Sequence, residues 1–209
     1  MNNRKNWLFL PILLLLLVLG YLLAPRMIPA DRFGFAYDIP EAEAALRMKL
    51  VDTACSWEGV REDDGSHRAV IDLYNTLSPL PQDYTLTYED SWCAAFVTVS
   101  ALQSGLTDII PPECSCARQV RLFQDLDRWE EHDGYRPLPG DIIYYDWDFS
   151  KKTDCIGWPE HVGIVVGTYG PFIRVMEGNK DDDASFRILW QNDWCIRGYG
   201  LPDYASKCR

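Results

Sequence analysis

The hydrophobic pattern of this chain changes its period once, near residue 140. Before that point, apolar side chains recur every three to four positions, as on helices that pack one face against a core. After Pro139 and Gly140, short apolar or alternating segments alternate with turns, which is typical of strands. Helices followed by a run of strands predict an α+β domain whose N-terminal helices pack on an antiparallel sheet. The predicted helices cover residues 41–57, 66–77, 91–103 and 116–131, and the predicted strands cover residues 141–146, 161–168, 172–177, 186–190 and 196–199.

The N-terminus carries an apolar run over residues 7–23, which Arg4 and Lys5 precede. An apolar helix of about 17 to 25 residues spans a bilayer, and cations before it favour a cytoplasmic N-terminus. A cleaved signal peptide is the alternative, although Ile28 is large for a cleavage site after Ala30. We therefore expect a transmembrane signal anchor, a linker and an extracytoplasmic folded domain, over residues 1–24, 25–40 and 41–209.

The part of the chain after the anchor is long enough to fold as one domain with a full core. The chain has 209 residues, of which 47% are hydrophobic and 13% aromatic, and this composition excludes a largely disordered protein. The formal net charge of −11 argues against nucleic-acid binding through a basic surface. An acidic protein that acts on an anionic polymer must bind it by shape and local contacts.

Cys93 and His161 are the best candidates for a nucleophile and its base. Cys93 stands at the predicted start of a helix, where the helix dipole and free N–H groups favour a thiolate and can bind an oxyanion. His161 opens an apolar strand and can exchange a proton with such a thiol. Each residue alone is more often part of a core. His67 and His132 are weaker candidates because they lie in polar segments.

Glu177 and Asn179 lie at the end of the strand that follows His161. A hairpin turn at Gly170-Pro171 would place Glu177 beside the imidazole of His161. A carboxylate there would fix the tautomer of the ring and stabilise its imidazolium form. The alternative is a polar hairpin end, because asparagine and glycine suit a turn for backbone reasons alone.

The chain contains seven cysteines, and an odd number leaves at least one thiol unpaired in an exported protein. Cys114 and Cys116 are too close in sequence for an unstrained disulfide with each other. A zinc site is a further alternative, although the spacing matches no usual finger or ribbon. With Cys93 as nucleophile, the pairing of the other six stays open, and we interpret them as structural: Cys55, Cys114, Cys116, Cys155, Cys195 and Cys208.

Four short motifs follow one another between residues 50 and 202. They are Trp92-Cys93-Ala94-Ala95-Phe96-Val97, Pro139-Gly140-Asp141-Ile142-Ile143-Tyr144-Tyr145-Asp146, His161-Val162-Gly163-Ile164-Val165 and Glu177-Gly178-Asn179. In this order they resemble the CHAP family, the cysteine- and histidine-dependent amidohydrolases and peptidases of bacterial cell walls. The resemblance implies a papain-like α+β fold and hydrolysis of an amide bond in peptidoglycan, by an N-acetylmuramoyl-L-alanine amidase or an endopeptidase.

The resemblance also implies a role for each candidate site residue. Cys93 would be the nucleophile, His161 the base, Glu177 the group that orients the base, and Asn179 a polar support. We predict no cofactor and no metal ion, although the acidic runs at residues 62–65 and 180–183 could hold calcium if they are not flexible loops. The alternative function is a non-catalytic papain-like module that binds wall peptides or a partner protein. The oligomeric state stays open.

Overall fold

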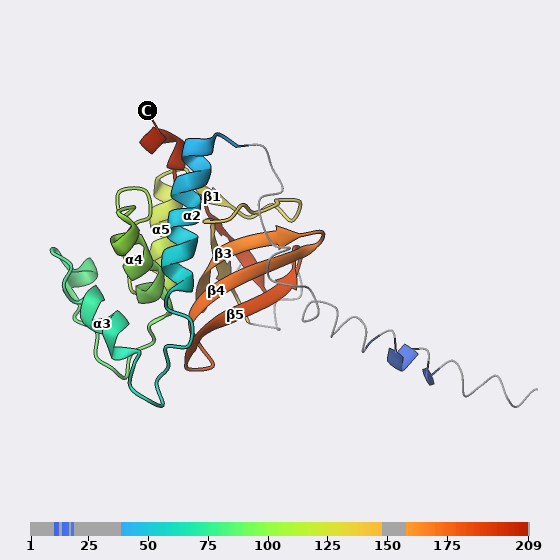
Figure 1. Cartoon of the computed structure of the whole chain (residues 1–209), viewed down its shortest axis with the longest axis horizontal. Helices are drawn as coiled ribbons and strands as arrows, with labels where there is room; N and C mark the ends of the chain where they lie inside the picture. The colour runs from blue at the N-terminus through green and yellow to red at the C-terminus, as the bar shows by residue number, and fades with distance from the viewer. Residues whose placement is uncertain (1–10, 13, 17, 19–38, 148–157, 209) are drawn as a thin grey trace, which may run out of the picture. The chain divides into compact units, whose positions relative to one another are not determined.

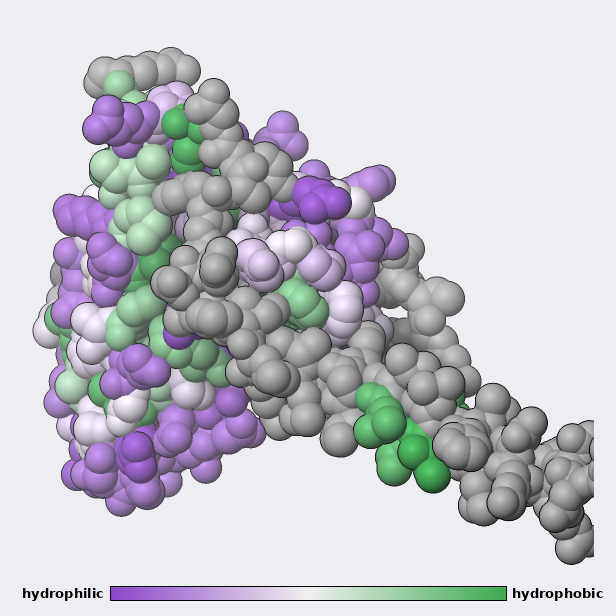
Figure 2. Space-filling view, turned by 45° about the vertical axis from the view of Figure 1, so that its right-hand side comes forward, coloured by the Kyte–Doolittle hydropathy of each residue, from purple (hydrophilic) through white to green (hydrophobic). Residues whose placement is uncertain are grey.

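The structure, a computed structural model, describes residues 11, 12, 14–16, 18, 39–147 and 158–208. By their internal contacts, the residues group into two units, Met1–Arg32 and Phe33–Arg209. Most of the predicted anchor lies outside the described residues. The described residues between 11 and 18 are helical and expose large apolar side chains, which are coloured as hydrophobic in Figure 2. Among all described residues, none of the helices is long and apolar enough to cross a membrane.

The second unit begins with helices, as the sequence pattern predicts (Figure 1). Its described residues form the α-helices α2 (Glu41–Cys55), α3 (Arg68–Tyr74), α4 (Cys93–Ser104) and α5 (Cys116–Asp125) and the short 3-10 helices η3 (Pro81–Asp83) and η4 (Tyr204–Cys208). Nearly every residue of α4 is buried, because α2, α3 and α5 surround it and the sheet lies on its remaining side. The helix ends at Gly105, which adopts the left-handed conformation (φ 69°) that glycine tolerates best.

The second half of the unit is one antiparallel sheet of six strands. The strands are β1 (Trp129–Glu130), β2 (Ile142–Tyr145), β3 (His161–Tyr169), β4 (Phe172–Lys180), β5 (Asp183–Trp190) and β6 (Ile196–Gly200), in the spatial order β1-β6-β2-β3-β4-β5. Helices that pack on an antiparallel sheet confirm the predicted α+β class. The hairpin turn at Gly170-Pro171 is also confirmed, since Tyr169 pairs with Phe172 across it.

Each face of the sheet has its own hydrophobic core. The side chains of Val162, Ile164 and Met176 join those of the helices in the larger core. The alternate positions on the same strands, such as Val165 and Val175, belong to a smaller core on the opposite face. The strands are therefore apolar on both faces, which explains why β3 reads as a nearly continuous apolar segment in the sequence.

Asp141, in the second of the four motifs, joins the first helix to the sheet. Its buried carboxylate accepts hydrogen bonds from Arg47 on α2 at 2.9 Å and from the hydroxyl of Tyr135 at 2.7 Å. The Arg47 guanidinium also lies over the ring of Tyr204 in η4. A buried carboxylate requires such partners, so this motif residue holds the fold together.

The predicted fourth helix is shorter than its apolar pattern indicates. The pattern continues to residue 131, but α5 ends at Asp125, and the positive φ of Asp127 (56°) turns the chain away from the helix axis. Trp129 then pairs with β6 as part of β1 and packs against Tyr144. Leu126, which follows the apolar spacing of the predicted helix and would lie on its buried face, is instead 54% exposed. Trp129 has helical spacing in the sequence, but it packs against the core from strand β1 and not from a helix.

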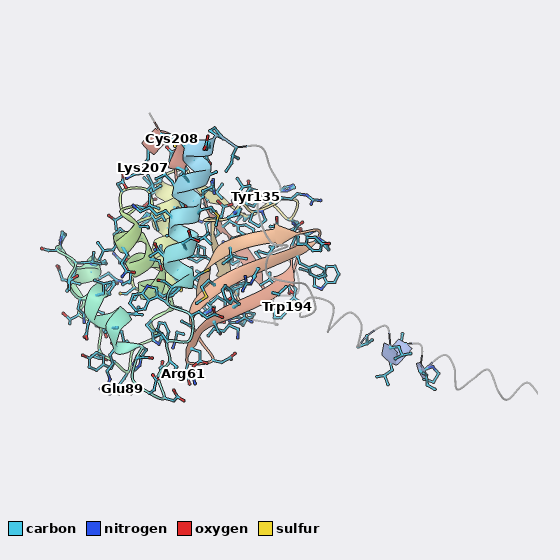
Figure 3. All side chains as sticks on the ribbon, viewed as in Figure 1. Arg61, Glu89, Tyr135, Trp194, Lys207 and Cys208 are labelled. Carbon is cyan, nitrogen blue, oxygen red and sulfur yellow. The ribbon has the colours of Figure 1, made fainter. Side chains whose placement is uncertain are left out.

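The acidic run at residues 180–183, for which a loop was predicted, forms a tight hairpin turn between β4 and β5. Asp181 and Asp182 both have positive φ, as the two central residues of a type I′ turn require. Arg61 pairs with Asp183, and the N–H of Glu62 donates to the carbonyl of Asp182. Figure 3 labels Arg61, which lies at this end of the sheet. The other acidic run, at residues 62–65, is thereby tied to the hairpin.

Candidate active site

Cys93 is the first residue of α4 and is 5% exposed. Gly178 on β4 allows this helix start to approach the sheet closely, because a Cβ atom there would lie 2.5 Å from Phe96 and 2.8 Å from the Trp92 ring. The first N–H groups of a helix have no partner within the helix, and the backbone N–H of Ala94 helps to lower the pKa of the Cys93 thiol. The sulfur therefore lies where a thiolate is stabilised.

His161 is the first residue of β3 and is also buried. Its ring stacks on that of Tyr145, with ring centroids 5.8 Å apart. Nε2 of His161 lies 3.1 Å from Oε2 of Glu177. Because Nε2 is engaged in this contact, Nδ1 is the ring nitrogen available for proton exchange with Cys93.

Glu177 reaches His161 across the β3–β4 hairpin. It pairs with Gly163, two residues after His161, and its side chain is completely buried. A Cβ atom at position 163 would lie 2.7 Å from Cγ of Glu177, so only glycine leaves space for the carboxylate to extend towards the histidine. This face of β4 carries the smaller core rather than the helices. Glu177 meets the ring because His161 projects from the same face.

Arg187 on β5 is a site residue that the sequence analysis missed. Its Nε lies 2.7 Å and 3.0 Å from the two carboxylate oxygens of Glu177, and its guanidinium lies over the rings of Tyr145 and Trp147. The only indication in the sequence was weak: Arg187 is a cation within the predicted strand at residues 186–190, which follows the strand that carries Glu177. The register of β4 against β5, which decides its neighbours, was not predictable.

Asn179 lines the same region but does not contact His161 through a hydrogen bond. Its side-chain amide donates to Oε1 of Glu62 at 2.8 Å, and the indole N–H of Trp92 donates to the same oxygen at 2.9 Å. Asn179 also has a positive φ of 56°, a conformation that asparagine tolerates well. Glu62 thus links the residue before Cys93 to the strand that carries Glu177, and the sequence analysis had not included it in the site.

The charges of this site favour a thiolate beside an imidazolium. A hydrogen bond from Cys116 and the hydrogen bond and charge of His161 lower the pKa of Cys93, despite burial. Burial opposes protonation of His161, but Cys93 and Glu177 outweigh it and raise its pKa to about 9. Burial likewise opposes ionisation of Glu177, yet His161 and Arg187 hold its pKa below the ordinary value. Each charge is stabilised by its neighbour.

The histidine distinguishes between the two cysteines near the site. Cys116, the first residue of α5, has its sulfur 3.6 Å from that of Cys93. The Cys93 thiolate and burial raise the pKa of Cys116. His161, in contrast, lowers the pKa of Cys93. The structure therefore brings Cys93, His161 and Glu177 together, with Asn179 beside them.

The site opens into a pocket of about 340 Å³, lined by Trp147, His161, Asn179, Lys180, Asp181 and Arg187. Trp147 stacks on Tyr145 and contacts the exposed Trp194, which Figure 3 labels. The lining combines an aromatic surface with charges of both signs. A polar ligand that approaches His161 would pass along this lining.

The two other histidines are not part of the site. His67 is buried, contrary to its polar sequence context, and its Nε2 lies 3.1 Å from the carbonyl oxygen of Tyr88. His132 is exposed in a loop, where its Nδ1 accepts a hydrogen bond from the N–H of Gly134.

Comparison of the chain with models of protein families, with curated proteins and with solved structures finds no match. Among the described residues, no three histidine, cysteine, aspartate or glutamate side chains gather in a way that could hold a metal ion. The chemistry of the site is therefore inferred from its own residues.

We expect Cys93 to react with iodoacetamide as a thiolate well below the ordinary cysteine pKa of about 8.5, because the Cys116 hydrogen bond and His161 stabilise the anion. Its alkylation rate, measured by peptide mass spectrometry across a pH series, should stay high on the acid side of that value. Cys114 is the control, since burial raises its pKa. His161→Ala should move the Cys93 profile to higher pH. A single shared profile for Cys93 and Cys114 would contradict the assignment.

Proposed function

We propose that this protein is a cysteine-dependent amide hydrolase of the CHAP type, with a papain-like domain that acts on peptidoglycan. The observation that carries the proposal is the chain of contacts from a thiol at a helix start, through a buried imidazole, to a buried carboxylate. Nucleophilic catalysis needs a nucleophile, a base beside it and a third group that orients the base. A module that only binds a ligand has no need of this set.

The proposed reaction begins with attack of the Cys93 thiolate on the carbonyl carbon of an amide. The oxyanion that forms is stabilised by N–H groups at the start of α4. His161, as imidazolium, donates its proton to the leaving amine, so that the C–N bond breaks and a thioester remains. The neutral imidazole then takes a proton from water, the hydroxide attacks the thioester, and the Cys93 thiolate leaves.

Glu177 and Arg187 act on this reaction through the imidazole. The carboxylate of Glu177 holds Nε2 of His161, so that Nδ1 is presented to Cys93 and to the leaving group. Arg187 binds both oxygens of Glu177 and keeps the carboxylate ionised in a buried place. Both are therefore positioning residues, whereas Cys93 and His161 are catalytic.

The proposed substrate class follows from the family resemblance and fits the pocket. Peptidoglycan stem peptides carry amide bonds, carboxylates and amines, and the pocket beside His161 offers Arg187, Lys180 and Asp181 next to the ring of Trp147. The bond that is cut is either the sugar–peptide amide or a peptide bond of the stem or cross-bridge. Binding would depend on these local contacts, because the net charge of the protein is −11.

Cys93→Ala should abolish release of soluble muropeptides from purified cell walls by the full chain. The change removes the nucleophile but little packing, so the denaturation midpoint should stay close to that of the unmodified protein. Mass spectrometry of the released fragments measures the activity and identifies the bond. Cys114→Ser is the matched control and should remain active. Full activity of Cys93→Ala, or no hydrolysis by the folded unmodified protein, would reject the proposal in favour of a binding module.

Glu177→Gln should lower kcat by at least roughly tenfold with little change in KM, because the lost charge matters mainly in the transition state. The active pair exists above the lowered pKa of Cys93 and below the pKa of His161, which is about 9. Without the carboxylate charge, the imidazolium loses stabilisation, so the alkaline limb of the pH–rate profile should move to lower pH.

Asn179→Ala provides the comparison, because its amide contacts Glu62 and not the imidazole. It should have a smaller effect than Glu177→Gln and leave the alkaline limb in place. A fully active Glu177→Gln beside an inactive Asn179→Ala would show that the amide, and not the carboxylate, is the third member.

We also propose that residues 7–23 anchor the protein in the cell membrane with the catalytic domain outside. Fractionation should recover the protein with membranes, and surface protease should degrade the domain in intact cells. A soluble mature form that begins at Asp31 would replace the anchor by a cleaved signal peptide, and the domain would then be secreted.

A further inference from the structure

The proposed nucleophile has a second thiol in direct contact. The sulfurs of Cys93 and Cys116 lie 3.6 Å apart, and the residues are 5% and 8% exposed. They come from the starts of two different helices and are separated by 23 positions in the chain. Two thiols held face to face in a buried place can close a disulfide with little movement.

The structure around Cys116 holds this thiol towards Cys93. The hydroxyl of Ser115 accepts a hydrogen bond from the N–H of Arg118 and caps α5, which fixes the first turn on which Cys116 stands. The neighbouring Cys114 lies in a different environment, where its sulfur accepts a hydrogen bond from Gln82. A disulfide bond is about 2.0 Å long, so the sulfurs of Cys93 and Cys116 would have to approach by roughly 1.6 Å, a distance that side-chain rotation can supply.

We propose that Cys116 is the resolving partner of Cys93 and that the two form a reversible disulfide when a peroxide reaches the site. The disulfide would switch the enzyme off and protect its nucleophile from irreversible oxidation. The inference uses the thiolate character of Cys93 but does not depend on which bond, or which substrate, the protein acts on.

The proposed oxidation proceeds in two balanced steps. The Cys93 thiolate attacks one oxygen of the peroxide, so that an S–O bond forms, the O–O bond breaks and the hydroxide that leaves takes up a proton. Cys93 is then a sulfenic acid, oxidised by two electrons, and the peroxide is reduced to water. Cys116 gives up its proton and attacks the Cys93 sulfur, the S–O bond breaks, and the leaving hydroxide and that proton form a second water. Two thiols and one peroxide thus give one disulfide and two waters.

The division of roles between the two cysteines follows from their surroundings. His161 lowers the pKa of Cys93 and favours its thiolate, and Cys93 is therefore the sulfur that reacts first. Cys116 stays protonated beside that anion and becomes a nucleophile when the sulfenic acid replaces the thiolate charge. An extracytoplasmic domain, as proposed above, would also meet more oxidising conditions than a cytoplasmic one.

The test treats the reduced full-length protein with hydrogen peroxide and maps its peptides without reduction. We expect a peptide pair joined through Cys93 and Cys116, and we expect dithiothreitol to restore alkylation of Cys93 by iodoacetamide. Cys116→Ser should lose this protection, so that Cys93 proceeds to the sulfinic acid and recovers at least roughly tenfold less alkylation after reduction. Cys114→Ser is the matched control and should behave as the unmodified protein does.

The peptide map of the unmodified protein decides the question even if Cys116→Ser does not fold. A disulfide between Cys93 and another cysteine, or sulfinic acid on Cys93 with Cys116 still reduced, would overturn the proposal. Alkylation and peptide mapping do not require hydrolysis of any substrate. A protein that forms the disulfide but does not release muropeptides would therefore reject the proposed function and support this inference.

Discussion

The buried carboxylate of Glu177 is the constraint on which the candidate site depends. A charged group that is removed from water is stable only with charged or hydrogen-bonding partners, and removal of one partner of a buried pair typically costs about 3–5 kcal/mol. Glu177 has two partners on opposite sides, His161 on β3 and Arg187 on β5. The β4 strand, which lies between β3 and β5, thus fixes the imidazole and the guanidinium together, and Gly163 provides the space that this arrangement requires.

The motif Glu177-Gly178-Asn179 joins the three charged groups of His161, Glu177 and Arg187 to the rest of the fold, because its three residues face different neighbours. Glu177 faces the imidazole, and Gly178 faces the opposite side of the sheet, where its missing side chain admits Trp92 and Phe96 of the α4 start. Asn179 has a positive φ where the register between β4 and β5 shifts. Its side chain donates a hydrogen bond to Glu62, which also accepts one from the indole N–H of Trp92. One short segment therefore positions both His161, the proposed base, and the helix that carries Cys93, the proposed nucleophile.

The sequence predicted the parts of the site that depend on neighbours close in the chain. The start of α4 was predicted at residue 91, two residues before its observed start at Cys93. The meeting of Glu177 with His161 follows from a two-residue hairpin turn between adjacent strands. Arg187, Glu62 and Cys116 were missed because each reaches the site through tertiary packing. Arg187 depends on a register that a bulge in β4 shifts, and Cys116 depends on how the starts of two helices approach each other. The end of α5 was misplaced for a similar reason, since Trp129 finds its core contact from a strand.

The same electrostatics explain why a thiolate can exist inside an acidic protein. The net charge of −11 disfavours a further anion such as the Cys93 thiolate. The carboxylate of Glu177 is also near, because only the side chain of His161 separates it from Cys93. The imidazolium between the two anions, the first N–H groups of α4 and the thiol of Cys116 together outweigh this cost for Cys93. The imidazolium and the N–H groups would serve the proposed hydrolysis directly. The thiol of Cys116 adds a liability, because a hydrogen-bond donor that is itself a sulfur can be oxidised together with the anion it stabilises. A hydroxyl in its place would stabilise a thiolate without that risk. The presence of a sulfur at this position is therefore a feature of the site that the proposed amide hydrolysis alone does not account for.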